Sequence, residues 1–130
     1  MSRTYDAGNV FARILRGEIP CKKILETAHS LAFPDINPLT PTHVLVIPKG
    51  AYIDFDDFSS RAGVDEIADY VRAVGEVARQ AGAVESGYRI LSNCGANAHQ
   101  EVPHLHIHIF AGRALGPMIA KLEQARTKNV

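Results

Sequence analysis

Apolar residues recur at helical spacing in two stretches of the chain. In residues 63–82 they form one stripe, charged residues occupy the other positions, and Gly82 ends the pattern. The members of the stripe are Val64, Ile67, Ala68, Val71, Val74, Ala78 and Ala81. Residues 9–20 repeat the spacing over a shorter length and stop at Gly17 and Pro20. The pattern predicts one long amphipathic helix and one short helix.

Short apolar segments between polar or proline-containing stretches predict strands. Residues 21–27 and 30–36 flank a polar turn and form an expected hairpin. Residues 43–50, which end in a proline and a glycine, predict a buried strand. Residues 87–93 predict another strand.

The remaining segments connect these elements. Residues 54–58 predict a small helical turn, residues 94–101 a loop, and residues 113–130 a segment that is partly helical at most. Strands outnumber helices and follow one another as hairpins, with one long helix inserted between two of them. This order predicts an α+β fold, in which helices pack on one side of an antiparallel sheet.

The composition predicts a single globular domain over residues 1–130. Hydrophobic residues make up 46% of the 130 residues and charged residues 22%, which suffices for one packed core. Lys plus Arg and Asp plus Glu each number 14. No net field therefore draws the protein to nucleic acid or to a membrane, and an anionic ligand must be held locally.

Targeting and redox signals are weak. The first 20 residues lack the apolar core of a signal peptide, and no apolar run approaches the roughly 18 residues of a membrane span. We therefore expect a cytoplasmic protein. Cys21 and Cys94 lie far apart without a CxxC pattern, so we expect two reduced thiols.

Half of the six histidines lie in one short segment. His104, His106 and His108 alternate with Leu105, Ile107 and Ile109. A strand turns successive side chains to opposite faces, so this alternation predicts a strand with three imidazoles on one face and an apolar opposite face. A helix would scatter the same residues.

Three explanations of the histidine face remain open. A metal site is disfavoured, because four residues of strand separate His104 from His108 by about 13 Å, whereas zinc ligands lie about 2 Å from the ion. A merely polar face is disfavoured, because burying three imidazoles costs free energy unless each has a hydrogen-bond partner. The third explanation is nucleophilic attack by a neutral imidazole on phosphorus.

Chemistry at phosphorus suits the residue types. The ordinary pKa of histidine, about 6.5, leaves a ring nitrogen free at neutral pH. Residues 93–98, with the sequence NCGANA, offer backbone N–H groups and an Asn side chain to an anion. The covalent intermediate on the imidazole would then be hydrolysed by water.

Several motifs together resemble a known family. The segment HLHIHIF resembles the histidine-triad motif. Together with FARILRGEIPCKKILET, LAFPDINPLTPTHVLVIPK and QEVPHLHIHIFAGRALGPMIA, it resembles the bacterial Hint branch of that family, the purine nucleoside phosphoramidases, over nearly the whole chain. The flanks differ from those of Fhit-like diadenosine polyphosphate hydrolases and galactose-1-phosphate uridylyltransferases.

The resemblance implies a fold and an activity. The fold is α+β with a five-stranded antiparallel sheet that continues across a homodimer. The activity is hydrolysis of the P–N bond in purine nucleoside 5′-phosphoramidates or of aminoacyl adenylates, which releases AMP or GMP without a cofactor or a metal. Two alternatives remain, namely a dinucleoside polyphosphate hydrolase and a nucleotide-binding or scaffolding module with incidental hydrolysis.

The resemblance also implies residue roles. His106 attacks the α-phosphorus, and His104 holds that ring, chiefly through its backbone. His108 donates to a phosphate oxygen, and His43 lies behind the nucleophile. Asp35 binds both ribose hydroxyls, which a carboxylate with two acceptor oxygens suits. The other implied nucleotide-binding residues are the base slot, Phe11, Ile14, Ile19, Phe33 and Ile36, and the phosphate-side donor Asn93.

Some positions depart from the family pattern. Certain relatives bind zinc through a CxxC near the first helix, but Asn9 and Ala12 occupy those positions here, which predicts no such site. His99 stands where glycine is usual. Glu101 stands where the animal branch has serine, and we expect it to help protonate the leaving group. These two residues leave the identity of the leaving group open.

Overall fold

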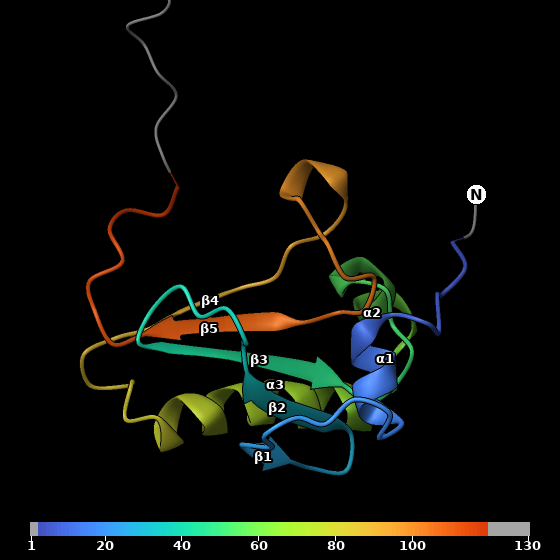
Figure 1. Ribbon diagram of the computed structural model, residues 1–130, viewed down its shortest axis with the longest axis horizontal. Coiled ribbons are helices and arrows are strands. Elements are labelled where there is room, and N and C mark those ends of the chain that lie inside the picture. Colours follow the sequence, from blue (N-terminus) through green and yellow to red (C-terminus); the bar gives the residue numbers. More distant parts are fainter. Residues whose placement is uncertain (1–2, 120–130) are drawn as a thin grey trace, which may run out of the picture.

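A five-stranded antiparallel sheet forms the centre of the molecule (Figure 1). The computed structural model describes residues 3–119. The sheet has the order β1-β2-β3-β5-β4. Its strands are β1 (Leu25–Glu26), β2 (Ser30–Pro34), β3 (Thr42–Pro48), β4 (Arg89–Leu91) and β5 (Ile107–Ala111). The predicted antiparallel α+β architecture is therefore confirmed.

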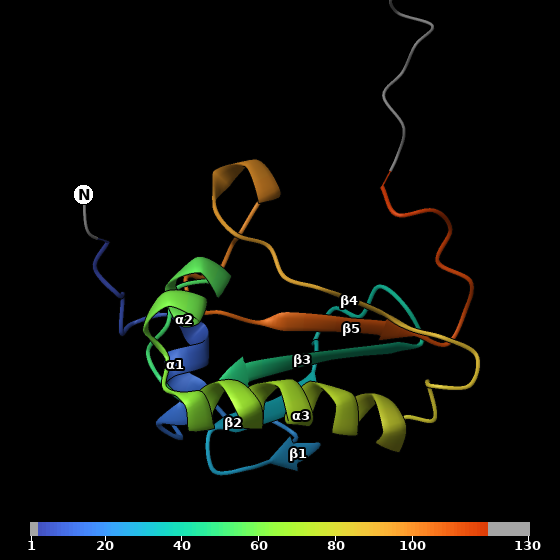
Figure 2. The same ribbon diagram turned by 180° about the vertical axis from the view of Figure 1, so that it is seen from behind.

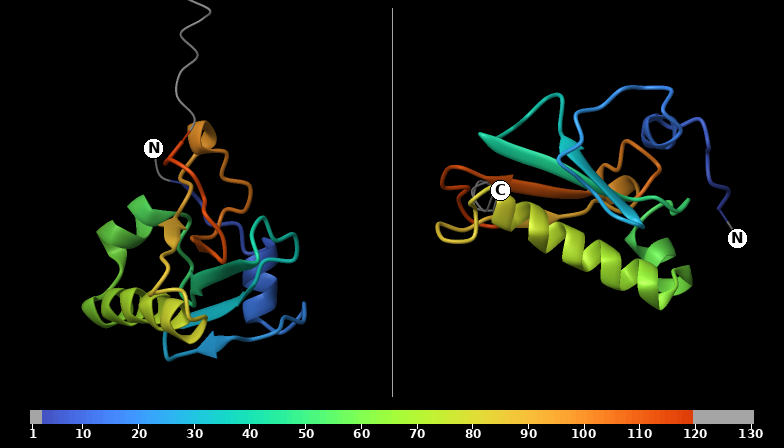
Figure 3. Two further views of the ribbon diagram at one scale, coloured as in Figure 1. Left: turned by 90° about the vertical axis from the view of Figure 1, so that its left-hand side faces the viewer. Right: turned by 90° about the horizontal axis from the view of Figure 1, so that it is seen from below.

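Between residues 3 and 119, three α-helices and one short 3₁₀ helix accompany the sheet. They are α1 (Val10–Leu15), α2 (Phe55–Arg61), α3 (Val64–Gln80) and η1 (Ala96–Ala98). The long helix α3 runs along one face of the sheet (Figure 2) and buries Tyr70, Ala73, Val74, Val77 and Ala78. Of the predicted stripe only Val74 and Ala78 are buried, whereas Val64 and Val71 are 82% and 66% exposed, so the helix is confirmed but its buried face is only partly the predicted one. The short helix α1 lies on the opposite face (Figure 3), so the expectation that helices pack on one side holds for α3 but not for α1.

Each face of the sheet has its own apolar cluster, because side chains alternate along the strands. The cluster under α3 consists of Ala32, Val44, Val46, Tyr52, Phe58, Tyr70, Ala73, Val74, Val77, Leu105 and Ile109. The cluster under α1 consists of Phe11, Leu31, Phe33, Leu45 and Ile47. Phe11 thus draws α1 onto the second face.

Several elements are shorter than the sequence pattern suggests. The hairpin over 21–36 forms, but β1 has only two residues. The strand expected over 87–93 is reduced to three residues in β4. Residues 113–119 form neither helix nor strand, and the rest of the predicted C-terminal segment lies outside the described residues. Within residues 3–119, none of the helices is long and apolar enough to cross a membrane.

Candidate active site

The histidine segment is only partly a strand. β5 begins at Ile107, so His104 and His106 precede it, and the expectation of one strand carrying all three imidazoles is wrong. The backbone leaves the ladder because its hydrogen bonds go elsewhere: the Leu105 N–H donates to the Tyr52 carbonyl at 2.8 Å. The alternation still holds, since Leu105 is buried under α3 while the imidazoles lie on the other side.

The sheet register places His43 and His108 on the face that α1 covers. His108 pairs with Leu45, and His43 pairs with Phe110, across the β3–β5 ladder. Directly paired residues point to the same face. Leu45 belongs to the cluster that contains Phe11, so both imidazoles lie on that face.

The imidazole of His106 has a fixed tautomer. Its Nδ1 lies 2.7 Å from the backbone carbonyl oxygen of His104. A carbonyl only accepts hydrogen bonds, so Nδ1 carries the proton and Nε2 keeps its lone pair. His106 is 7% exposed, and Phe11 packs edge-on against its ring at 4.9 Å between centroids. The free nitrogen of His106 therefore has the character of a nucleophile.

His104 is fully buried and hydrogen-bonded at both nitrogens. Its Nε2–H donates to the carbonyl of Pro48 at 2.9 Å. Its Nδ1 must then accept, and the hydroxyl of Tyr5 donates to it at 2.5 Å. The ring of His104 thus anchors the backbone carbonyl that orients His106.

A second relay fixes His108. The backbone N–H of Leu39 donates to Nδ1 of His43 at 3.1 Å, so the proton of His43 lies on Nε2. Nε2–H of His43 donates to Nδ1 of His108, with 3.0 Å between the two nitrogens. Oδ2 of Asp35 lies 3.4 Å from Nε2 of His43. Nδ1 of His108 accepts, which leaves Nε2–H of His108 as a donor.

Burial keeps these imidazoles neutral. It lowers the pKa of His104 to about 4 and, with the nearby His106 and His43, lowers the pKa of His108 to about 4. Burial also lowers the pKa of His106, while the His104 carbonyl, Asp35 and Glu101 oppose the shift. A histidine with an ordinary pKa would lose activity as the pH falls below about 6. Because the pKa of His106 is lowered, we expect this loss of activity at lower pH.

The buried neutral imidazoles should make stability depend on pH. The unfolded chain protonates His104 near pH 6.5, whereas the folded protein does so only near pH 4. The contribution of neutral His104 to the free energy of unfolding is therefore fully present above about pH 6.5 and is lost as the pH falls toward 4. From pH 7.5 to 5, His104 alone should lower the free energy of unfolding by on the order of 2 kcal/mol. Urea unfolding at both pH values measures this.

Both urea titrations use the same protein, so only the protonation of its groups differs between them. An unfolding free energy that is equal at pH 7.5 and pH 5 would contradict the burial of neutral imidazoles.

A cavity of about 870 Å³ opens beside these histidines. Most predicted site residues line it: Phe11, Ile14, Ile19, Phe33, Asp35, Ile36, Asn93, Glu101, His106 and His108. Ile36 is 91% exposed, so its apolar side chain is available to a ligand. His104 and His43 lie behind the lining and reach the cavity through their hydrogen-bond partners. The structure thus brings the predicted residues around one space.

The loop at one end of the cavity carries His99 and Glu101. His99 has a left-handed backbone with φ of 59°, a conformation that glycine adopts more easily. Its Nε2 lies 3.9 Å from Oε1 of Glu101, and both side chains are exposed. Gln100 fastens the loop, because its amide donates to the carbonyls of Ile53 and Val102 and accepts from Gly95 N–H.

The residues that replace the family CxxC have a structural role. The side chain of Asn9 caps α1 by accepting from Ala12 N–H at 2.9 Å. A different group could in principle hold a cation: Asp35, His43 and His108 each offer an atom, all within 4.8 Å of one another. In the hydrogen-bonded arrangement, however, Nε2 of His43 carries a proton and does not offer a lone pair.

Sequence patterns missed the residues that support the imidazoles from afar. Tyr5 lies 99 positions from His104, and the Pro48 carbonyl lies 56 positions away. Gln100 lies beside the motif but contacts Ile53, 47 positions away. Local periodicity carries no signal for such contacts.

The fold and the site define an α+β protein in which His106, with an unprotonated ring nitrogen, and His108, with a ring N–H, line one cavity. Residues 16–115 match the HIT domain. An uncharacterised 13.2 kDa HIT-like protein of Azospirillum brasilense is 76% identical over 121 residues, which are 93% of this chain and 99% of that protein. The chain belongs to the HIT family.

Two further relatives extend the comparison. The purine nucleoside phosphoramidase of Escherichia coli K12 is 36% identical over 111 residues, covering 85% of this chain and 92% of that protein. A HIT family hydrolase from Clostridium thermocellum has a solved structure that matches with a TM-score of 0.80 at 36% identity, covering 87% of this chain and 97% of that one. Together these matches place the chain with the HIT family hydrolases.

Proposed function

We propose that the protein hydrolyses purine nucleoside 5′-phosphoramidates, with aminoacyl adenylates as further candidate substrates. The main support for the proposal is that hydrogen bonds fix the tautomers of His106 and His108 at the cavity. His106 presents an unprotonated Nε2, and His108 presents an Nε2–H donor. A nucleophile and an oxyanion donor side by side suit displacement at phosphorus.

The reaction then has two balanced steps. Nε2 of His106 forms a bond to the α-phosphorus while the P–N bond breaks, and the leaving nitrogen takes up a proton and departs as an amine. Water next attacks the phosphorus, loses a proton, and breaks the His106–phosphorus bond to release AMP or GMP. Glu101, exposed at the end of the cavity, is our candidate for carrying the proton to the amine.

The rest of the cavity accommodates a nucleoside. Phe11, Ile14, Ile19, Phe33 and Ile36 form its apolar part, which suits a purine ring. Asp35 lines the same cavity, with a carboxylate oxygen within 4.8 Å of a ring nitrogen of His108, and its Oδ1 accepts from the Asn37 N–H. We assign it the ribose hydroxyls and assign Asn93 the phosphate. The similarity to the purine nucleoside phosphoramidase of Escherichia coli supports the proposed substrate class.

Substrate comparison tests the proposal. Adenosine 5′-phosphoramidate should give AMP with a higher kcat/KM than diadenosine polyphosphates, and turnover should persist in the presence of a chelator. Mass spectrometry of the quenched reaction should find a nucleotidyl adduct on His106. Faster turnover of diadenosine polyphosphates would indicate the alternative hydrolase. Tight AMP binding with negligible turnover of every phosphoramidate would indicate a binding module.

We also propose a homodimer in which the sheet continues between subunits. β4 lies at the edge of the sheet and pairs only with β5 among the described strands. Ile90 is 50% exposed and Leu91 37% exposed, so the edge carries apolar side chains that a second copy could bury. Light scattering should give about twice the chain mass of 14.2 kDa. A monomeric mass at micromolar concentration would contradict this.

A further inference from the structure

The N-terminal segment reaches the histidine cluster through one hydroxyl. Tyr5 precedes the part of the chain that matches the HIT domain, which starts at residue 16. Its ring nevertheless packs edge-on against the ring of His104, with 5.6 Å between centroids. Its hydroxyl donates to Nδ1 of His104. Two segments 99 residues apart thus share one hydrogen bond directly behind the nucleophile.

The direction of this hydrogen bond follows from the other partner of His104. Nε2–H of His104 donates to the Pro48 carbonyl, so Nδ1 can only accept. His104 has no exposed surface, and an acceptor in such a place costs free energy when it lacks a donor. Tyr5 supplies that donor and locks both the tautomer and the rotation of the ring.

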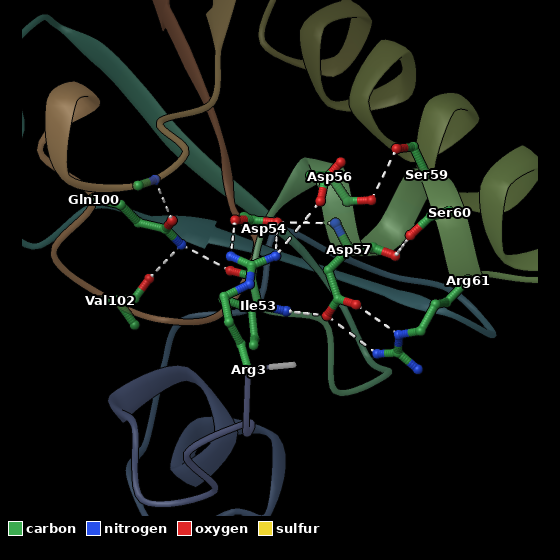
Figure 4. Close-up of polar contacts among 11 residues, drawn as sticks. Arg3, Ile53, Asp54, Asp56, Asp57, Ser59, Ser60, Arg61, Gln100 and Val102 are labelled. Atoms are coloured by element: carbon green, nitrogen blue, oxygen red, sulfur yellow. Dashed lines mark hydrogen bonds and ion pairs between the residues drawn. The ribbon is translucent and has the colours of Figure 1, made fainter. Parts of the chain in front are cut away.

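The segment that carries Tyr5 is fastened on both sides. On one side, the guanidinium of Arg3 binds both oxygens of Asp54, at 2.5 and 3.2 Å (Figure 4). Asp54 is 3% exposed and also caps α2 through the Asp57 N–H. On the other side, the side chain of Arg16 donates to the Ala7 carbonyl at 2.7 Å. Tyr5 is therefore held between two fixed points.

The anchor of this segment also adjoins the loop at the end of the cavity. Figure 4 shows Gln100 bound to the carbonyl of Ile53, the residue that precedes Asp54. The N-terminal segment and the loop with His99 and Glu101 therefore meet at the same turn before α2. Through Arg3 and Asp54, the segment that carries Tyr5 is thus connected to the turn that also holds Gln100.

We propose that Tyr5 is a positioning residue for the nucleophile. Its hydroxyl holds the ring of His104, and the backbone carbonyl of His104 holds Nδ1–H of His106, so that Nε2 of His106 faces the cavity. The inference rests on the proposed function, because it assigns Tyr5 to the same reacting imidazole. Tyr5 itself does not line the cavity, so we assign it no contact with the substrate.

A Tyr5→Phe substitution tests this inference, because it removes the hydroxyl and keeps the ring. We expect kcat for adenosine 5′-phosphoramidate to fall about tenfold, with KM within about twofold of the parent value, because supporting residues of a reactive group typically matter by one to two orders of magnitude. Tyr88→Phe is the matched control, since Tyr88 is 40% exposed and lies outside the cavity lining. It should leave kcat unchanged.

A second readout does not depend on substrate. In ¹⁵N spectra of histidine-labelled protein, the parent should show His104 with its proton on Nε2 and His106 with its proton on Nδ1. Tyr5→Phe should shift the Nδ1 signal of His104 toward that of an unbonded nitrogen and should alter the signals of His106. Arg3→Gln, which loosens the segment without touching Tyr5, should give a smaller change of the same kind.

The two readouts separate the possible failures. If Tyr5→Phe leaves both kcat and the histidine spectra unchanged, the positioning role is overturned. If the spectra shift as described while neither protein turns over a phosphoramidate, the geometric part stands and the proposed function is wrong. If Tyr5→Phe unfolds the protein, Arg3→Gln decides: parental kcat and spectra in that folded variant overturn the inference.

Discussion

Asparagine in place of His106 should reduce phosphoramidate turnover on the order of 10⁴-fold or more, because loss of a covalent nucleophile removes the main reaction path. The amide of asparagine has no nucleophilic ring nitrogen to replace Nε2. The amide N–H of asparagine can replace the hydrogen bond to the His104 carbonyl, so we expect the local backbone conformation to be unchanged. Single-turnover kinetics with adenosine 5′-phosphoramidate measure the loss.

Two controls make the His106 result specific. AMP binding should remain within a few-fold of the parent, because the apolar part of the cavity and Asp35 are untouched. His29→Asn, the same substitution outside the cavity, should turn over like the parent. A His106→Asn protein that retains the parental rate, or that still forms the nucleotidyl adduct, would end the assignment of the nucleophile.

The parts of the fold that local pattern determines could be predicted from the sequence. The apolar spacing over 63–82 predicts α3 at Val64–Gln80, because residues three and four apart share one face of a helix. It predicts the buried face only in part, since Tyr70 and Val77 are buried while Val64 and Val71 are exposed. The alternation of His with Leu and Ile likewise predicts which side chains face the core. Leu105 and Ile109 are both buried under α3 although β5 begins only at Ile107.

The parts that depend on distant partners could not be predicted in this way. The start of β5 depends on where its neighbours pair with it and on the Leu105 N–H finding the Tyr52 carbonyl instead. The side on which α1 packs depends on Phe11 joining Phe33 and Leu45. The low pKa of His104 depends on burial, which no spacing of residues reports.

Alanine in place of His108 should lower kcat by about 10²- to 10³-fold with little change in KM, because removing a single oxyanion donor typically has that effect. The relay from Leu39 N–H through His43 leaves the proton of His108 on Nε2. With a pKa of about 4, His108 stays neutral and keeps this donor at every pH above about 5. Steady-state kinetics at pH 7 measure the split between kcat and KM.

The split distinguishes a transition-state donor from a residue that merely helps binding. Phosphate oxygens gain charge as the P–N bond breaks, so a donor aimed at them stabilises the transition state more than the bound substrate and acts on kcat. His43→Ala keeps the His108 ring but removes the N–H that fixes its tautomer. Some of the molecules then still carry the proton of His108 on Nε2. We therefore expect kcat to fall less than in His108→Ala. If His108→Ala raises KM and leaves kcat at the parental value, the ring serves ground-state binding, and the donor to the transition state must be sought among the other groups at the cavity, such as Asn93.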